Sequence, residues 1–196
     1  MSGSLTTNYF ESAEIQSSNT TRISESMSRK VYRKNVGGQH WMMTLESKNL
    51  TRAEKAELFA FLAKQQGSFD SFTIVPPLYG STRSTNAIDT PTVTEDYAAG
   101  VTSIRAQGGG GSLLAGDFIK FSNHDKVYML TQDVNQDLSS EDYFEITPPL
   151  HKAIDNTTTI TYNDVPFKVY QTSDMTSFKT NIDGTSKITI AVREDI

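Results

Sequence analysis

One stretch of this 196-residue chain carries the pattern of an amphipathic α-helix, and that helix limits what the rest can fold into. Residues 52–66 are good helix formers. Thr51 and Glu54 form a capping-box pattern, in which each side chain satisfies a free backbone N–H, and Gly67 gives the expected end. One helix with one apolar face should lie across a sheet, so we predict a mainly β protein with one α-helix. The apolar stripe of the helix is formed by Leu58, Phe59 and Leu62.

The residues before the helix predict the sheet that it covers. Trp41, Met43 and Leu45 alternate with residues of the opposite face, as in a half-buried strand. A second alternating run, residues 23–31, lies before Gly37-Gly38, and the glycine pair predicts the turn of a hairpin between the two runs. Residues 1–21 are polar and are expected to form a partly extended arm. The predicted structural core where helix and sheet meet consists of Trp41, Leu58, Phe59 and Leu62.

The pattern of the sequence changes after residue 80, and this change predicts a second domain. A strand within residues 69–75 ends at Pro76-Pro77, because proline cannot donate to a β-ladder. Residues 80–92 are rich in Ser, Thr and Asn, which is typical of a linker. Short strands without a helix between them follow, and they predict a small barrel. The candidate strands are 101–106, 117–121, 126–131, 143–147, 158–162 and 167–171.

The last strand of the sequence sets the predicted topology. Ile188, Ile190 and Val192 alternate with polar or small residues, so this strand is half-buried. It comes after the barrel and must pair somewhere, and we expect it to return to the first domain. The predicted division is therefore a first domain of residues 1–88 and 172–196 and a barrel domain of residues 89–171.

Motifs that would carry catalysis or bind a metal are incomplete in this sequence. There is no cysteine, and the glycines at 108–111 lack the Lys-Ser/Thr of a phosphate-binding loop, so a hairpin tip explains them better. The histidines are dispersed, and neighbouring carboxylates lie in polar contexts where solvated turns are the default. We therefore expect no catalytic residue, no cofactor and no metal site. The residues considered and set aside are His40, His124, His151, Glu95-Asp96 and Glu141-Asp142.

The charge of the chain limits its partners. The net charge of −5 argues against a protein that grips nucleic acid by neutralising phosphates. Basic residues cluster once, at residues 29–34, where Arg29 and Arg33 share one strand face and Lys30 and Lys34 share the other. This pattern favours an interface or a protected strand edge. The chain begins without the pattern of a signal peptide and has no apolar run of transmembrane length, so we expect no membrane partner.

Four segments, taken in order, carry a resemblance to a known family. The most specific is Ala115-Gly116-Asp117 through Ser122, followed by His124 and Lys126-Val127-Tyr128. They resemble the distal tail proteins of long non-contractile phage tails, most of all those of the Demerecviridae siphophages. The resemblance spans about Gln39 to the end and does not include the first twenty residues. The other three segments are Gln39-His40-Trp41 with Ala60-Phe61-Leu62 and Pro76-Pro77-Leu78, Phe144-Glu145-Ile146-Thr147-Pro148-Pro149-Leu150, and residues 188–196.

The resemblance implies a fold and a role. It implies a ring-forming β-domain, similar in plan to tail-tube proteins, with an inserted small barrel of the oligonucleotide/oligosaccharide-binding (OB) type. Such proteins form a homo-hexameric ring between the tail tube protein and the baseplate hub protein, and genome DNA passes through without specific binding. They lie at the tail tip of the virion, are made in the host cytoplasm, and have no catalytic residues to transfer.

Two other functions compete with this hypothesis. The barrel could be a saccharide-binding module for host-surface attachment, since barrels of this class bind saccharides elsewhere. Exposed aromatic side chains on the barrel would favour it. An enzyme, such as a cell-wall hydrolase, would need a tuned acid–base pair that the sequence does not indicate. The aromatic candidates for a saccharide site are Tyr97, Tyr128, Tyr143, Phe144 and Tyr162.

Overall fold

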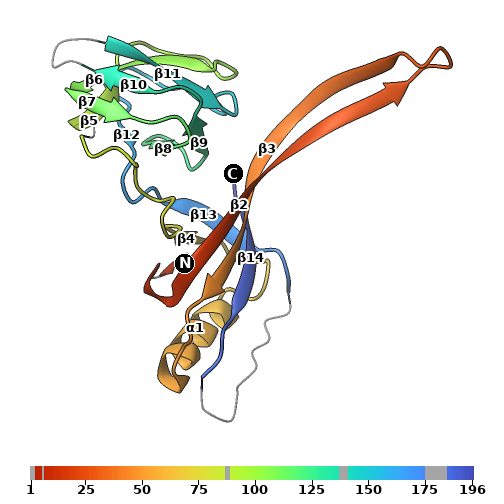
Figure 1. The fold of residues 1–196 in the computed structure, drawn as a ribbon, viewed down its shortest axis with the longest axis vertical. Helices are drawn as coiled ribbons and strands as arrows, with labels where there is room; N and C mark the ends of the chain where they lie inside the picture. Colours follow the sequence, from red (N-terminus) through yellow and green to blue (C-terminus); the bar gives the residue numbers. More distant parts are fainter. Residues whose placement is uncertain (1–2, 6, 87–88, 137–140, 175–184) are drawn as a thin grey trace.

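The computed structural model describes residues 3–5, 7–86, 89–136, 141–174 and 185–196. The chain is mainly β, with 49% strand, and these residues contain a single α-helix (Figure 1). The strands form two units: a six-stranded sheet that carries the helix, and a nearly closed barrel-like sheet of six strands inserted between β4 and β13. The predicted fold class, mainly β with one helix and a small barrel, is confirmed.

The first sheet has the strand order β1-β4-β13-β14-β3-β2. Strand β1 pairs with β4 in parallel, and the other neighbours are antiparallel. Part of the segment expected to be an arm is thus sheet: β1 and most of β2 form its two edges, joined by a 3-10 turn at Thr7–Tyr9. The bounds are β1 (Ser4–Leu5), β2 (Phe10–Glu25), β3 (Val31–Ser47), β4 (Phe72–Ile74), β13 (Phe167–Gln171) and β14 (Thr189–Glu194).

Helix α1 (Arg52–Lys64) follows β3 and lies against the sheet. The Thr51 side chain accepts a hydrogen bond from the Glu54 N–H, and the Glu54 carboxylate accepts one from the Thr51 N–H at 2.9 Å, so the predicted capping box is confirmed. Gln171, at the end of β13, donates through Nε2 to the Leu62 carbonyl at 3.1 Å, which ties sheet to helix. The first hydrophobic core comprises Leu5, Phe10, Trp41, Met43, Leu45, Leu50, Leu58, Leu62, Phe72, Ile74, Phe118, Val127, Val165, Phe167, Val169, Ile188, Ile190 and Val192.

One member of the predicted core is corrected. Trp41, Leu58 and Leu62 are buried in the first core, whereas Phe59 is only partly buried and is not one of its buried members. Phe61 packs against this core instead, with its ring centroid 5.5 Å from that of Phe72 in an edge-to-face arrangement. The physical reason is the helical period: at about 100° per residue, Phe59 lies roughly 80° from the middle of the arc that the buried positions form, and so at its flank. Those buried positions are Lys55, Leu58, Leu62 and Gln65.

The predicted hairpin exists, but its turn lies elsewhere. The chain reverses at residues 26–30, where Arg29 adopts a φ of 60°. Gly37 and Gly38 lie inside β3, both with positive φ, beside shifts in the register of β2 against β3 at Thr20. The glycine pair therefore forms an irregularity in a long two-stranded ribbon, for which only glycine readily supplies the backbone conformation.

The second unit has the strand order β12-β8-β9-β11-β6-β5. It nearly closes because β5 approaches β12, where the Val93 N–H donates to the Thr158 carbonyl at 2.9 Å. A two-stranded sheet of β7 (Gly111–Leu113) and β10 (Val134–Gln136) accompanies it, and the glycines at 108–111 run from the end of β6 to the start of β7. The barrel strands are β5 (Asp89–Val93), β6 (Ser103–Gly109), β8 (Phe118–Phe121), β9 (Val127–Leu130), β11 (Glu141–Thr147) and β12 (Ile160–Thr161).

The boundaries between the units differ from those predicted. Strand β13, assigned to the barrel from its sequence, pairs with β4 and β14 in the first sheet, so the return from the barrel comes before Phe167 and not at residue 172. Strand β5 begins at Asp89, within the predicted linker. The prediction that the last strand returns to the first unit is confirmed, because β14 pairs with β3 from Thr189 to Arg193.

Substitutions in the helix should separate buried from flanking positions. Leu62→Ala should lower the free energy of unfolding by about 2–5 kcal/mol, because it leaves a cavity in the first core. Phe59→Ala should cost clearly less, since this side chain is already partly in solvent. Urea unfolding followed by the fluorescence of Trp41, the only tryptophan, measures both. Equal losses in the two variants would contradict this assignment of the helix face.

Candidate interaction surfaces

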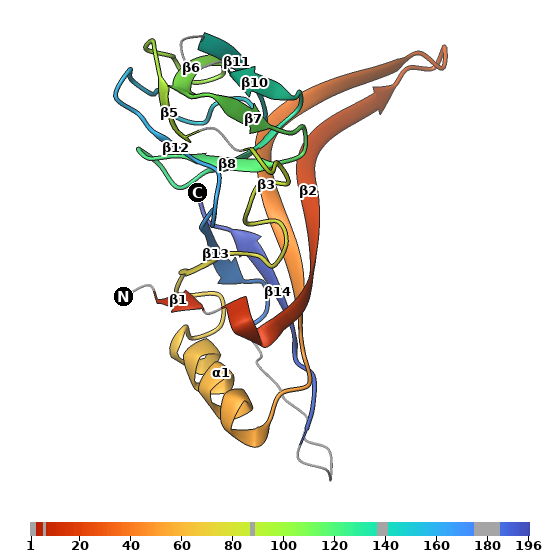
Figure 2. The ribbon, with the colours of Figure 1, turned by 60° about the vertical axis from the view of Figure 1, so that its left-hand side comes forward.

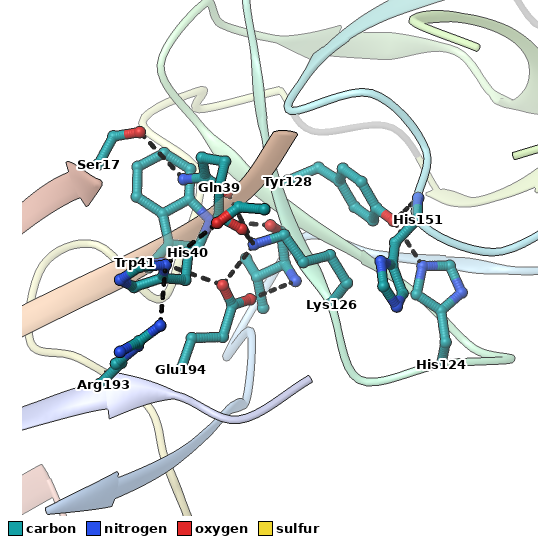
Figure 3. Close-up of polar contacts among 12 residues, drawn as sticks. Ser17, Gln39, His40, Trp41, His124, Lys126, Tyr128, His151, Arg193 and Glu194 are labelled. Atoms are coloured by element: carbon teal, nitrogen blue, oxygen red, sulfur yellow. Dashed lines mark hydrogen bonds and ion pairs between the residues drawn. The ribbon is translucent and has the colours of Figure 1, made fainter. Parts of the chain in front are cut away.

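The two units are joined by a buried ion pair between Lys126, which precedes β9 of the barrel, and Glu194, at the end of β14 (Figure 3). Their side chains are 2% and 0% exposed. Lys126 Nζ also donates to the Gln39 side-chain Oε1 at 2.8 Å and to the Gln39 carbonyl at 3.2 Å. Glu194 accepts the backbone N–H of Val127 at 2.9 Å and that of Trp41 at 3.1 Å. We call these five residues the joint.

Trp41 completes the joint on its apolar side. Its indole Nε1 donates to the Val127 carbonyl at 2.8 Å, and its ring meets Phe118 of β8 edge to face at 5.1 Å. The ammonium of Lys126 lies 5.9 Å from the centre of the indole ring. Phe118 and Val127 belong to the barrel by chain but to the first hydrophobic core by packing. The contact between the units is therefore an extension of that core, and the ion pair lies within it.

Burial determines the electrostatics of the joint. Removal from water lowers the pKa of the Lys126 ammonium below its ordinary value, and the charge and hydrogen bond of Glu194 oppose this. Taking two charges out of water costs several kcal/mol for each, which only close pairing and further hydrogen bonds offset. Here the carboxylate has two backbone donors besides the lysine, and the lysine has two further acceptors. The pair is fully satisfied only when both units are in place.

A second contact binds the linker to the barrel through Asp117, which is buried. Its carboxylate accepts hydrogen bonds from the Thr82 hydroxyl, from the Arg83 backbone and side chain, and from the Leu114 N–H at 3.0 Å. Gly116 has a φ of 93°, a conformation suited to glycine, and leads the chain into this turn. Parts of the segments that carry the resemblance therefore build the joint and the Asp117 contact. These parts are Gln39-His40-Trp41, Ala115-Gly116-Asp117, Lys126-Val127-Tyr128 and Glu194.

The structure brings two of the three dispersed histidines together around Tyr128 (Figure 3). The Tyr128 hydroxyl accepts the His151 backbone N–H at 2.8 Å and lies 2.7 Å from His124 Nε2, to which it can donate its proton. Burial, helped by the nearby His151, Lys152 and Lys120, lowers the pKa of His124 to about 4. A neutral imidazole that accepts a hydrogen bond from the Tyr128 hydroxyl at Nε2 fits this arrangement.

Of the carboxylates and aromatic residues singled out from the sequence, Asp96 and Tyr97 line one shallow hollow beside Ile154. Glu95 pairs with Arg105, and Asp142 accepts backbone N–H groups; the side chain of Glu141 lies outside what the structure describes. No group of three or more His, Asp or Glu that could hold a metal occurs among the described residues. Of the five barrel aromatics, Tyr128 and Phe144 are buried and Tyr143 is exposed. Tyr97 and Tyr162 pack against the second hydrophobic core, which the buried side chains of the barrel form.

The most exposed element is the outer part of the β2–β3 hairpin, residues 19–38, which we call the ribbon (Figures 1 and 2). Every residue of the ribbon is exposed except Ser26, which is partly buried. Among the described residues, neither the first nor the second hydrophobic core includes a residue of the ribbon. Large apolar side chains are nevertheless placed there, and their exposed fractions are 64% for Ile23, 106% for Met27, 47% for Val31, 55% for Tyr32 and 56% for Val36.

The ribbon is also strongly basic. It holds five basic residues and one acidic residue, a net charge of +4. Since the whole chain has a net charge of −5, the residues outside the ribbon carry −9. Arg22 and Lys34 are direct cross-strand partners, and like charges in this position destabilise a hairpin. A two-stranded ribbon is marginally stable by itself in water. The ribbon therefore combines exposed apolar side chains with a basic excess.

Comparisons with known proteins place the chain in no family. A scan against models of protein families finds no match, and a search of curated proteins finds none either. Among the described residues, no helix is both long and apolar enough to cross a membrane.

The joint predicts unequal effects for two neighbouring carboxylates. Glu194→Ala should lower the free energy of unfolding by about 3–5 kcal/mol, because it leaves Lys126 buried without its counter-ion. The matched control is Asp195→Ala, which removes a partly exposed ion pair with Lys168 and should cost at most about 1 kcal/mol. Urea unfolding gives both values, and the emission of Trp41 should shift to the red only in the Glu194 variant. Similar losses in both variants would show that the joint contributes little.

His124 should make stability depend on pH. Its folded pKa, about 4, lies below the ordinary value of 6.5, so between these values the unfolded chain binds the extra proton. Stability should therefore fall as pH falls from 6.5 to 4, by up to about 1.4 kcal/mol per pH unit from this group. Unfolding curves of the wild type and of His124→Gln measure this, since the variant should lose that part of the slope. Parallel pH profiles would contradict the assignment.

Proposed function

We propose that this chain is a structural protein of the distal tail type. Its copies would form a hexameric ring that joins the tail tube protein to the baseplate hub protein and leaves a passage for DNA. The fold supports the proposal, since a β-sheet with one helix and an inserted barrel is the plan that the resemblance implies. The segments that carry the resemblance also lie where the two units meet.

The observation that carries the proposal is the ribbon. A protein that acts as a monomer has no use for a long hairpin with exposed Ile23, Met27 and Tyr32, because such residues promote association. A subunit of a closed ring does have a use for it. Rings are built from head-to-tail contacts, in which each subunit offers one surface and receives another. The ribbon is a surface of the offered kind, and it projects away from both units (Figure 2).

The charge distribution agrees with a passage for DNA. Attraction to phosphate rises with each lysine or arginine that faces it, so a lumen that lets a genome slide must carry few of them. In this chain, the basic excess is concentrated in the ribbon and the remainder is acidic. A ring that covers its ribbons between subunits would keep these basic groups away from the passing DNA.

The location and copy number of the chain test the proposal. In virions that carry it, immunogold particles should bind at the tail tip, and quantitative mass spectrometry should give six copies for each tail. The ribbon-less variant replaces residues 22–34 by Asn-Gly, which joins the paired residues Thr21 and Asn35 by a tight turn and keeps the register of β2 and β3. It should keep the melting temperature of the wild type, because the ribbon lies outside both cores, and it should fail to enter tails.

Four outcomes would contradict the proposal. Labelling along the whole tube or at the head would place the chain elsewhere, and normal tails with the ribbon-less variant would remove the observation that carries it. Turnover of peptidoglycan, surface polysaccharide or DNA that is lost on replacing Asp142 or His124 would make the chain an enzyme. Polysaccharide binding without turnover, lost on replacing Tyr143, would favour the saccharide-binding alternative.

A further inference from the structure

We propose that the turn at residues 76–80 is the docking surface for the ribbon of a second copy of this chain. We call this segment the Leu78 turn. The inference rests on the proposed ring, and it adds which surface of one subunit receives the ribbon of the next.

The Leu78 turn presents a large apolar side chain in an unusual way. Leu78 is 90% exposed and has a φ of 66°, in the left-handed region that leucine rarely adopts. The turn is closed by a hydrogen bond from the Gly80 N–H to the Pro76 carbonyl at 3.0 Å, and the Gly80 carbonyl accepts the Val165 N–H at 2.8 Å. An unfavourable backbone held in place by its surroundings, with an uncovered apolar tip, points to a role outside the subunit.

The surroundings of Leu78 suit contact with an apolar side chain of another subunit. The adjacent Tyr79 is 44% exposed, and its ring packs edge to face on Phe118 at 6.3 Å, so the surface beside Leu78 is firm. A hollow lies next to the turn, and Arg83, a cation in its described lining, is paired with the buried Asp117. The described lining of this hollow includes Leu78, Tyr79, Ala115, Gly116 and Phe118.

The position of the turn in the sheet fits a head-to-tail contact. Strand β4, which the turn follows, lies beside the edge strand β1, whereas the ribbon grows from β2 and β3 at the opposite edge. In a head-to-tail ring whose sheets lie edge to edge, which we take as part of this proposal, the β2 edge of one subunit faces the β1 edge of the next. The ribbon extends about 25 Å beyond its base, at about 3.3 Å per residue, which is roughly the width of a small domain.

Charge favours a second copy over other occupants. The ribbon carries +4 and the remainder of the same chain −9, so the ribbon of one copy is attracted to the body of another. Asp164, whose N–H lies 3.5 Å from the Ser81 hydroxyl, is exposed beside the Leu78 turn. An acidic side chain there would offset the repulsion between Arg22 and Lys34, which are opposite each other on the ribbon.

Cysteine cross-linking tests the contact directly, because the chain has no cysteine of its own. Met27→Cys in the ribbon and Leu78→Cys in the turn are made in two full-length chains with tags of different size, which are mixed and treated with a short bismaleimide. The matched control replaces Leu78→Cys by Ala98→Cys, an exposed position on the barrel. Melting temperatures of all variants should equal that of the wild type, because none of these side chains is in a core.

The expected result is a mixed product at least tenfold more abundant with Leu78→Cys than with Ala98→Cys. The yield should fall several-fold when Arg33→Glu and Lys34→Glu are added to the ribbon chain. A mixed product no more abundant than the control would overturn the docking surface. Six copies at the tail tip together with that result would leave the ring standing with another contact, whereas a strong cross-link without a ring in tails would refute the ring and keep the contact.

Discussion

The structure depends on one buried interaction between charges that are far apart in the sequence. Lys126 comes from the inserted barrel and Glu194 from the last strand of the sheet, and both are almost fully withdrawn from water. In any other orientation of the two units, each charge would be buried without its partner or would have to be hydrated inside the first core. The pair therefore acts on orientation more than on net stability: it makes alternative packings of the barrel costly. The two β units are thereby held in one arrangement relative to each other.

Local signals predicted the local structure. The capping box at Thr51 and Glu54 and the alternation in the last strand both depend on residues close in sequence, and both are present. The same kind of evidence misplaced the hairpin turn, because a glycine pair fits a bulge as well as a turn. It also overvalued Phe59, since polar Lys55 and Gln65 occupy buried positions of the helix. Because the prediction considered apolar residues alone, it placed the buried face of the helix too close to Phe59.

Long-range pairing could not be predicted from the sequence. Strand β13 has the composition of a barrel strand, and only its pairing with β4 and β14 assigns it to the sheet. The joint was missed in the same way, although a signal was present. Glu194 continues the inward-facing positions of Ile190 and Val192, and a carboxylate in that register requires a buried partner. Nothing in the sequence around Lys126 identifies it as that partner, because their contact depends on how the barrel folds back.

The joint also connects the interior of the molecule to the ribbon. Gln39 and Trp41 lie on β3 where the ribbon begins, and both bond to groups of the joint. Gln39 further donates to Ser17 on β2 at 3.0 Å, so both strands of the ribbon are fixed at its base. A ribbon that leaves the body in a set direction loses less conformational freedom on docking than a loose one, and association is correspondingly more favourable. The buried pair of Lys126 and Glu194 that orients the barrel therefore also orients the ribbon, the surface by which one subunit would hold the next.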